Sequence, residues 1–168
     1  MEVKFKTHII DMSHLVEAPA GKYGFLKQVG SELKFEKSDK PVKLWGCGAN
    51  YLAMSRPEMT QRIRYLRKHG INMVRQHPLQ SVLGLLRKDG TFNPENLDNW
   101  DWWFAELKRH GIYMTWSLFY PHRVTSDEGY DLSDELPDGK GAKSTSGLVN
   151  IEPALQESEW RWAKAILL

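Results

Sequence analysis

An internal repeat constrains the fold of this chain more than any other feature of its sequence. Residues Leu66–Met73 read almost like Leu107–Met114, at an offset of 41 residues. In both copies a basic segment meets His-Gly-Ile, and an apolar-rich run follows. Glycine just past a helix adopts the left-handed conformation without a Cβ penalty, and cations there interact favourably with the helix dipole. Each copy therefore predicts a helix, a glycine cap and a strand.

A helix start precedes each of these two caps. Ser55 and Glu58 have the spacing of a capping box, with Pro57 in the first turn, and Asn93 followed by Pro94 is typical of a second helix start. Apolar residues then follow at helical spacing: Met59, Ile63 and Leu66 in the first helix, and Leu97, Trp100, Phe104 and Leu107 in the second. The tryptophans Trp100 and Trp103 are predicted to be core residues of the second helix.

Strands alternate with these helices along the chain. The predicted strands are Val42–Asn50, Asn72–His77 and Tyr113–Tyr120, and a third helix is predicted from Pro153 onward. Alternation of this kind is typical of an α/β fold with parallel strands and right-handed crossovers.

The chain before residue 42 follows a different pattern. Phe25–Val29 and Leu33–Glu36 predict a β-hairpin joined by Gly30 and Ser31, so residues 1–41 read as an amino-terminal extension. Farther along, Val124–Asn150 is predicted to be a loop of 27 residues. A loop this long is either functional or a linker, and the sequence leaves both interpretations open.

Composition limits the size and the partners of the protein. The 168 residues suit one domain, and a net charge of only +2 argues against a nucleic-acid binder. No apolar run approaches the ~18 residues of a membrane span, and no signal peptide is visible, so exported and cytoplasmic locations both stay open. The single cysteine, Cys47, excludes an internal disulfide framework and reads as a small buried residue.

The length of the repeat region predicts an incomplete barrel. Residues 42–168 supply about three units of 41 residues, whereas a (β/α)8 barrel needs eight units and ~250 residues. The last helix also keeps an apolar face up to Leu168 without a cap. We therefore expect the first three βα units of a TIM barrel, preceded by the hairpin segment. The alternative is a small three-stranded α/β domain, which would leave its sheet edges uncovered.

An ordered set of short motifs resembles the opening of the cellulase-like, family-five type of retaining glycoside hydrolases. The motifs are Asp11–Ser13, Pro19–Phe25, Leu44–Asn50, Gly70–His77, Leu97–Asp98 and Gly111–Met114. They cover nearly the whole chain in the right order. The resemblance implies a (β/α)8 enzyme that hydrolyses O-glycosidic bonds of a poly- or oligosaccharide with two carboxylates. It implies neither a cofactor nor a metal.

The resemblance also implies that the catalytic glutamates lie beyond this chain. In the family they follow the fourth and seventh strands, the first within an Asn-Glu pair, and this sequence contains no Asn-Glu dipeptide. We therefore expect no catalytic residue within the chain and no hydrolysis by the 168 residues alone. Glu58 and Glu95 are better explained as first-turn helix residues favoured by the helix dipole.

The supporting half of a site is expected at the carboxyl ends of the strands. Arg75 matches the family arginine that bonds the nucleophilic carboxylate, and His77 matches a histidine that holds a sugar hydroxyl or orients a carboxylate. The alternatives are a structural ion pair for Arg75 and a pocket-wall histidine for His77. Candidate substrate-binding residues are Asn50, Tyr51, Trp116, Tyr120 and His122. Pro78 and Phe119 depart from the family pattern, because both remove polar groups from the expected sugar-facing rim.

Other chemistry finds little support in the sequence. The six histidines include no pair that shares a helix at metal-ligand spacing, and no phosphate-binding glycine motif is present. The basic run of Arg62, Arg64, Arg67 and Lys68 is predicted to be a solvated helix face. The expected partner is thus a carbohydrate, with no nucleic acid and no membrane. A non-catalytic carbohydrate-binding barrel and an enzyme of phosphorylated sugars remain the alternatives.

Overall fold

The computed structural model describes residues 11–49, 54–76, 85, 91–117, 123–125, 142–144 and 150–167. The chain divides into two compact units. The first contains residues 1–76 and 99–115, and the second contains residues 77–98 and 116–168. The fold is mixed α/β, as the sequence predicts.

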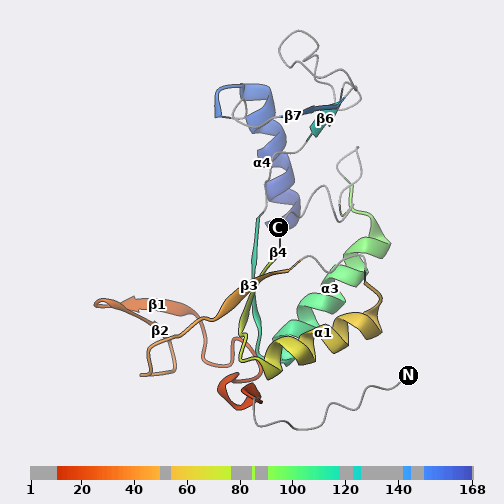
Figure 1. Cartoon of the computed structure of the whole chain (residues 1–168). Helices are drawn as coiled ribbons and strands as arrows, with labels where there is room; N and C mark the ends of the chain where they lie inside the picture. Colours follow the sequence, from red (N-terminus) through yellow and green to blue (C-terminus); the bar gives the residue numbers. More distant parts are fainter. Residues whose placement is uncertain are drawn as a thin grey trace. The chain divides into compact units, whose positions relative to one another are not determined.

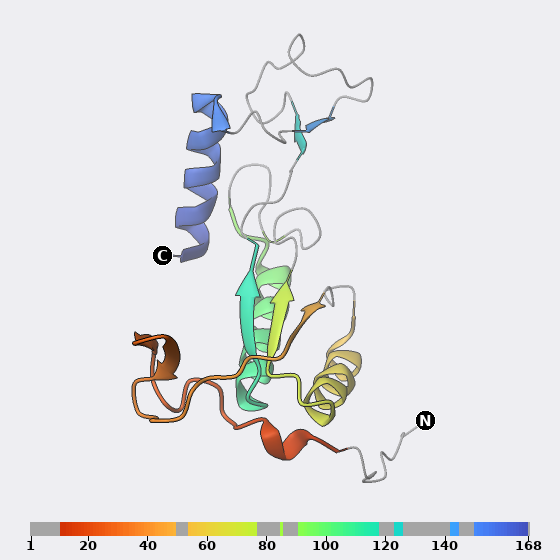
Figure 2. The same cartoon turned by 60° about the vertical axis from the view of Figure 1, so that its left-hand side comes forward.

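A three-stranded sheet forms the centre of the first unit. Its strands are β3 (Gly46–Ala49), β4 (Met73–Gln76) and β5 (Tyr113–Trp116), in that order across the sheet. β3 and β4 pair in parallel, and Figure 2 shows the arrows of β4 and β5 running in the same direction. The predicted alternation of strands and helices thus produces a sheet in which neighbouring strands follow one another in the sequence.

Helix α1 (Arg56–Lys68) begins at the predicted capping box. The Glu58 carboxylate accepts hydrogen bonds from the Ser55 backbone N–H (2.8 Å) and from the Ser55 hydroxyl (2.6 Å). The predicted apolar stripe is confirmed, because Met59, Ile63 and Leu66 are all buried.

Helix α3 (Pro94–Arg109) begins after Asn93, whose side-chain oxygen accepts from the backbone N–H groups of Glu95 (3.2 Å) and Asn96 (3.4 Å). Its buried apolar residues are Trp100, Trp103 and Leu107. The expected position of Phe104 in this stripe is wrong: Phe104 is 42% exposed. The neighbouring Trp103 has a larger apolar side chain than Phe104, and Trp103 is the one of the two that is buried.

α1 and α3 lie side by side on the same face of the sheet (Figures 1 and 2). Arg56 joins them, because its Nε donates to the Asn99 side-chain oxygen at 3.1 Å and its guanidinium lies 5.3 Å from the centre of the Trp102 ring. Val74 of β4 is completely buried. Burial of Val74 between flanking half-exposed and exposed residues indicates that the two helices cover this face of the strand.

The predicted hairpin is confirmed within one residue at each end. Strands β1 (Leu26–Val29) and β2 (Glu32–Phe35) pair antiparallel around a two-residue turn. Gly30 of that turn has a φ of +63°, a conformation that glycine adopts without steric cost.

Strand β3 begins at Gly46 rather than at the predicted Val42. Two hydrogen bonds explain the difference. The Val42 N–H donates to the Leu33 carbonyl (2.7 Å), and the Trp45 N–H donates to the side-chain oxygen of Asn72 (2.7 Å). The segment before Gly46 is thus held by the hairpin and by the Asn72 side chain. It reaches the sheet at its last residue, because the Trp45 carbonyl accepts from the backbone N–H groups of Asn72 (3.1 Å) and Met73 (3.3 Å).

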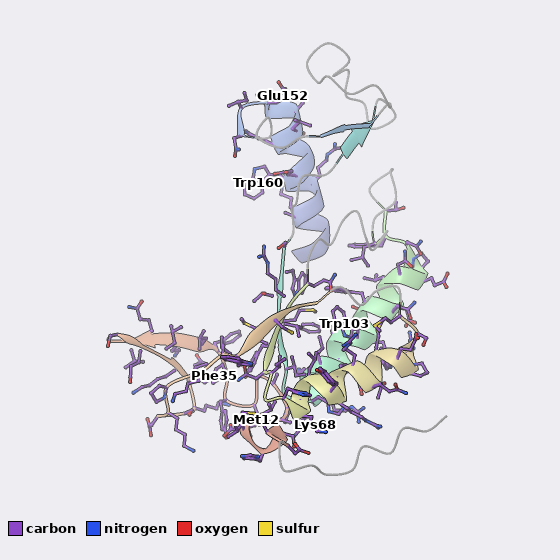
Figure 3. All side chains as sticks on the ribbon, viewed as in Figure 1. Met12, Phe35, Lys68, Trp103, Glu152 and Trp160 are labelled. Atoms are coloured by element: carbon purple, nitrogen blue, oxygen red, sulfur yellow. The ribbon has the colours of Figure 1, made fainter. Side chains whose placement is uncertain are left out.

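Residues 12–20, which we call the strap, lie across the carboxyl-terminal ends of both helices. The strap contains the 3₁₀ turn η1 (Ser13–Leu15). The Met12 N–H donates to the Lys68 carbonyl and the Ala20 N–H donates to the Lys108 carbonyl, both at 2.8 Å. Figure 3 shows Met12 and Lys68 side by side at this end of α1. The strap therefore satisfies carbonyls that a helix end leaves without intrahelical partners.

The strap also changes part of the predicted solvated face of α1. Arg62 and Arg64 are exposed as expected, but Arg67 and Lys68 are half-buried. Arg67 reaches the strap, where its Nη2 donates to the Val16 carbonyl (3.5 Å). The prediction for these two residues is wrong, because it considered the helix without the segment that packs on its end.

The second unit contains the third helix and a short ribbon. α4 (Pro153–Leu167) begins at the predicted residue, and the Glu152 carboxylate accepts from the Ala154 N–H at 3.2 Å. Figure 3 labels Glu152 at this helix start and the exposed Trp160 farther along. Part of the predicted loop at 124–150 is strand instead, because β6 (Arg123–Thr125) and β7 (Ala142–Ser144) pair antiparallel.

Candidate functional site

The predicted site residues fall into two groups. Arg75 lies near the end of β4 and Trp116 is the last residue of β5, so both are at the carboxyl ends of strands, as expected. Five further candidates lie outside the described residues: Asn50, Tyr51, His77, Tyr120 and His122. The two family departures, Pro78 and Phe119, also lie outside them.

The register of β3 and β4 defines the surroundings of Arg75. Gly46 is paired with Met73, and Gly48 is paired with Arg75. A Cβ built on Gly46 would lie 2.8 Å from the Met73 Cε, so paired residues share a face of the sheet. A Cβ built on Gly48 would meet no heavy atom of the described residues within 4 Å. Open space therefore borders the exposed Arg75 on the β3 side.

Alternation along β4 separates Arg75 from the helix layer. Val74 and Gln76 are completely buried, whereas Met73 is half-buried and Arg75 is exposed. Because successive strand residues point to opposite faces, Arg75 is on the face that α1 and α3 do not cover. That face is the interior face in a barrel whose helices form the outer ring.

Gln76 is a residue that sequence reasoning missed. Its side chain is completely buried, and within the described part of the chain neither its amide nitrogen nor its amide oxygen has a hydrogen-bond partner. Unsatisfied buried polar atoms are rare and costly in folded proteins. The sequence did contain a sign of this burial. Gln76 lies two residues after Val74, and residues at this spacing in a strand share a face, so its amide is on the face that the helices cover.

Trp116 is half-buried at the end of β5. Counting back from Trp116 in steps of two leads to the half-buried Met114 and the buried Ile112. Met114 and Trp116 share one face of β5, because side chains alternate along a strand, and Ile112 lies just before the strand begins. The role of Trp116 as the wall of a sugar-binding cleft stays a prediction.

The described carboxylates lie on helices, the hairpin, the strap and the turns beside them, and none lies at the carboxyl ends of β3, β4 or β5. Glu58 and Glu95 occupy first turns of helices, as predicted. Hydrogen bonds from the side chain and the backbone of Ser55 lower the pKa of Glu58. In the described ranges, no three His, Cys, Asp or Glu side chains gather as a metal site would require.

Cys47 is half-buried rather than buried as expected. Partial burial raises the pKa of the Cys47 thiol, which disfavours the reactive thiolate.

Comparison with known proteins gives no relative for this chain. No protein-family model matches it, and no curated protein and no solved structure matches it either. Among the described helices, none combines the length and the apolar character that crossing a membrane requires.

Proposed function

We propose that residues 42–168 are the first three βα units of a (β/α)8 barrel in a retaining glycoside hydrolase of the cellulase-like type. The consecutive order of β3, β4 and β5 supports this proposal. So does the position of α1 and α3 on one face only, because a barrel has helices outside and side chains inside. The other face of the sheet is then the barrel interior.

The position of Arg75 carries the proposal. Arg75 is on the uncovered face, near the carboxyl end of β4, beside the open space at Gly48. Retaining glycosidases need one carboxylate as nucleophile and one as acid/base, about 5–5.5 Å apart. A guanidinium stays charged and offers a planar fork of donors, so it keeps a neighbouring nucleophile ionised and oriented. Arg75 is therefore a positioning residue, and the two glutamates come from later strands.

The chemistry that follows uses Arg75 as a fixed donor. The nucleophilic carboxylate attacks the anomeric carbon while the second carboxyl group protonates the leaving oxygen. Water then releases the sugar with retained configuration, and the acid/base residue takes the proton from that water. A charged donor held in place stabilises the carboxylate throughout, without reorganisation during the reaction.

Arg75→Lys tests this role in the complete protein that contains this chain. Lysine keeps the charge and loses the planar fork, so kcat should fall roughly 10²-fold or more while KM changes much less. Steady-state kinetics on a cleaved oligosaccharide measure both constants, and proton NMR of the first product gives the anomeric configuration. Arg64→Lys on the exposed face of α1 is the matched control and should keep normal kcat.

Near-normal kcat in Arg75→Lys would show that Arg75 is a bystander, and inverted products would exclude the retaining mechanism. The 168 residues alone should not hydrolyse aryl glycosides above background, because both glutamates lie beyond them. Hydrolysis that is lost on changing one of the chain's own acids would contradict the proposal.

A non-catalytic carbohydrate-binding barrel is the second candidate. No carboxylate of the described residues lies on β3, β4 or β5, and this observation favours the binding function for this chain taken alone. Electrophoresis through gels containing soluble β-glucan, xylan or mannan separates the candidates. Retarded migration without hydrolysis by the complete protein supports the binding function.

A further inference from the structure

A cavity of about 210 Å³ opens at the amino-terminal ends of the sheet strands, the end opposite to Arg75. The strap and the turn after it form one side of the cavity. The segment between β2 and β3 forms another, and Asn72 and Tyr113, at the starts of β4 and β5, complete it. All of these residues belong to the first unit.

The lining of this cavity carries excess positive charge. Lys22, Lys40 and Lys43 line it together with one acid, Glu17. The Lys22 Nζ lies 3.5 Å from the Glu17 Oε2, so these two charges balance. A hydrogen bond from the Tyr23 hydroxyl, and then the charges of Lys22 and Lys40, lower the pKa of Glu17, which therefore stays ionised. Within the described residues, neither the Lys40 nor the Lys43 side chain has an ion-pair partner.

Stacked aromatic rings form a rigid wall of the cavity. The Phe35 and Tyr113 rings stack with their centres 5.4 Å apart, and Tyr23 lies tilted 6.5 Å from Phe35. The Tyr113 hydroxyl also accepts from the Gly21 N–H at 3.0 Å. Figure 3 labels Phe35 where the hairpin meets the sheet. Because residues from three segments fix this wall, a ligand would order few side chains on binding.

We propose that this cavity binds a small anion carried on a compact ring, with its charge at Lys40 and Lys43 and its body against the Phe35–Tyr113 wall. The anionic group is a carboxylate or a phosphate ester, because lysines that form no ion pair within the described residues can pair with either. The cavity is smaller than the roughly 300 Å³ at which drug-sized pockets begin, so the ligand is of monosaccharide size. This site is independent of the glycosidase proposal, because it lies at the other end of the strands.

Calorimetric titration of the 168-residue chain tests the site with four probes: D-glucuronate, D-glucose 6-phosphate, neutral D-glucose and inorganic phosphate. At least one anionic sugar should bind about tenfold or more tightly than glucose and than inorganic phosphate. Its affinity should fall as salt is raised, because the lysines are exposed. The preferred sugar identifies the group as a carboxylate or as a phosphate ester. Equal affinity for glucose and both anionic sugars, or no binding of either anionic sugar, would overturn the proposal.

Lysine variants then locate the binding. The double variant Lys40→Gln with Lys43→Gln should weaken binding of the preferred sugar about tenfold or more. Lys37→Gln is the matched control, because Lys37 is exposed on the same segment but does not line the cavity, and its effect should stay below twofold. Circular dichroism checks that each variant folds. If the double variant does not fold, the single variant Lys43→Gln tests the site in its place, and its affinity for the preferred sugar should fall about threefold. Equal losses in Lys37→Gln and Lys43→Gln would mean non-specific attraction and would exclude the site.

Discussion

The two copies of the repeat end in the same turn, but their tolerance for a side chain differs. Gly70 and Gly111 both have positive φ, +73° and +81°. A Cβ at Gly70 would meet the Met12 Cβ at 3.4 Å, which is an ordinary van der Waals contact. A Cβ at Gly111 would lie 2.3 Å from the Glu17 carbonyl oxygen. The local sequence sets the turn, and the strap decides how strictly glycine is required.

The histidines before these glycines differ in the same way. His69 is exposed, and its Nδ1 lies 2.8 Å from the Tyr65 carbonyl oxygen. His110 is half-buried, and its Nε2 lies 3.3 Å from the Oε1 of Glu106, a buried carboxylate that also pairs with Arg109. The residue four positions before the histidine is Tyr65 in the first copy and Glu106 in the second. The end of α1 with Tyr65 faces solvent at His69, whereas the end of α3 with Glu106 is packed at His110.

Gly111→Ala should have the largest effect on this comparison. A left-handed alanine costs about 1–2 kcal/mol, and the clash with the backbone of Glu17 adds to that, so we expect a loss of roughly 3 kcal/mol or more. Chemical denaturation monitored by circular dichroism measures the loss. An unchanged midpoint would show that the strap is not held against Gly111 in solution.

Gly70→Ala is the matched variant in the other copy. Only the left-handed strain applies there, because the nearest Met12 atoms lie at ordinary contact distance, so the expected loss is about 1–2 kcal/mol. The same denaturation measurement applies. A loss equal to that of Gly111→Ala would mean that both turns are limited by φ alone and that the strap contributes nothing to the difference.

His110→Gln should have the smallest effect, and it acts on the pH dependence. Burial is the largest cause that lowers the pKa of His110 below its ordinary 6.5. The charges of Arg109 and Arg67 lower this pKa further, and Glu106 opposes the shift without cancelling it. The unfolded chain then binds more protons than the folded one, so stability decreases as the pH falls through about 6.5. Removing the imidazole should reduce the fall in Tm between pH 7.5 and pH 5.5.

The matched control for this measurement is His69→Gln, which should keep the fall in Tm of the unmodified chain because His69 is exposed. Identical pH profiles for the two variants would contradict the inferred difference between the two helix ends.

Signals that act within a few residues were predictable from the sequence. The capping box at Ser55, the Asn93 cap and the hairpin turn at Gly30 each depend on neighbours in the chain, and each was found where expected. Contacts between distant segments were not predictable. The later start of β3 depends on the Asn72 side chain 27 residues away, and the burial of Arg67 depends on the strap.

The candidate site was predictable only to the level of strand ends. The rule that barrel sites lie at carboxyl ends of strands selected Arg75, and alternation along β4 then assigned its face. The burial of Gln76 and the amino-terminal cavity depend on how separate segments pack, which periodicity does not encode. The glutamates implied by the resemblance stay a prediction about sequence beyond Leu168.

The strap has a consequence for the order in which the protein folds during synthesis. Its residue Ala20 is made early, but the carbonyl to which it binds belongs to Lys108, which is added roughly 90 residues later. At about 5–20 residues per second, the ribosome needs several seconds to supply that partner. The end of the strap at Ala20 must therefore wait for α3 before it can dock, and in a nascent chain stalled before residue 108 this end stays accessible to proteases and chaperones.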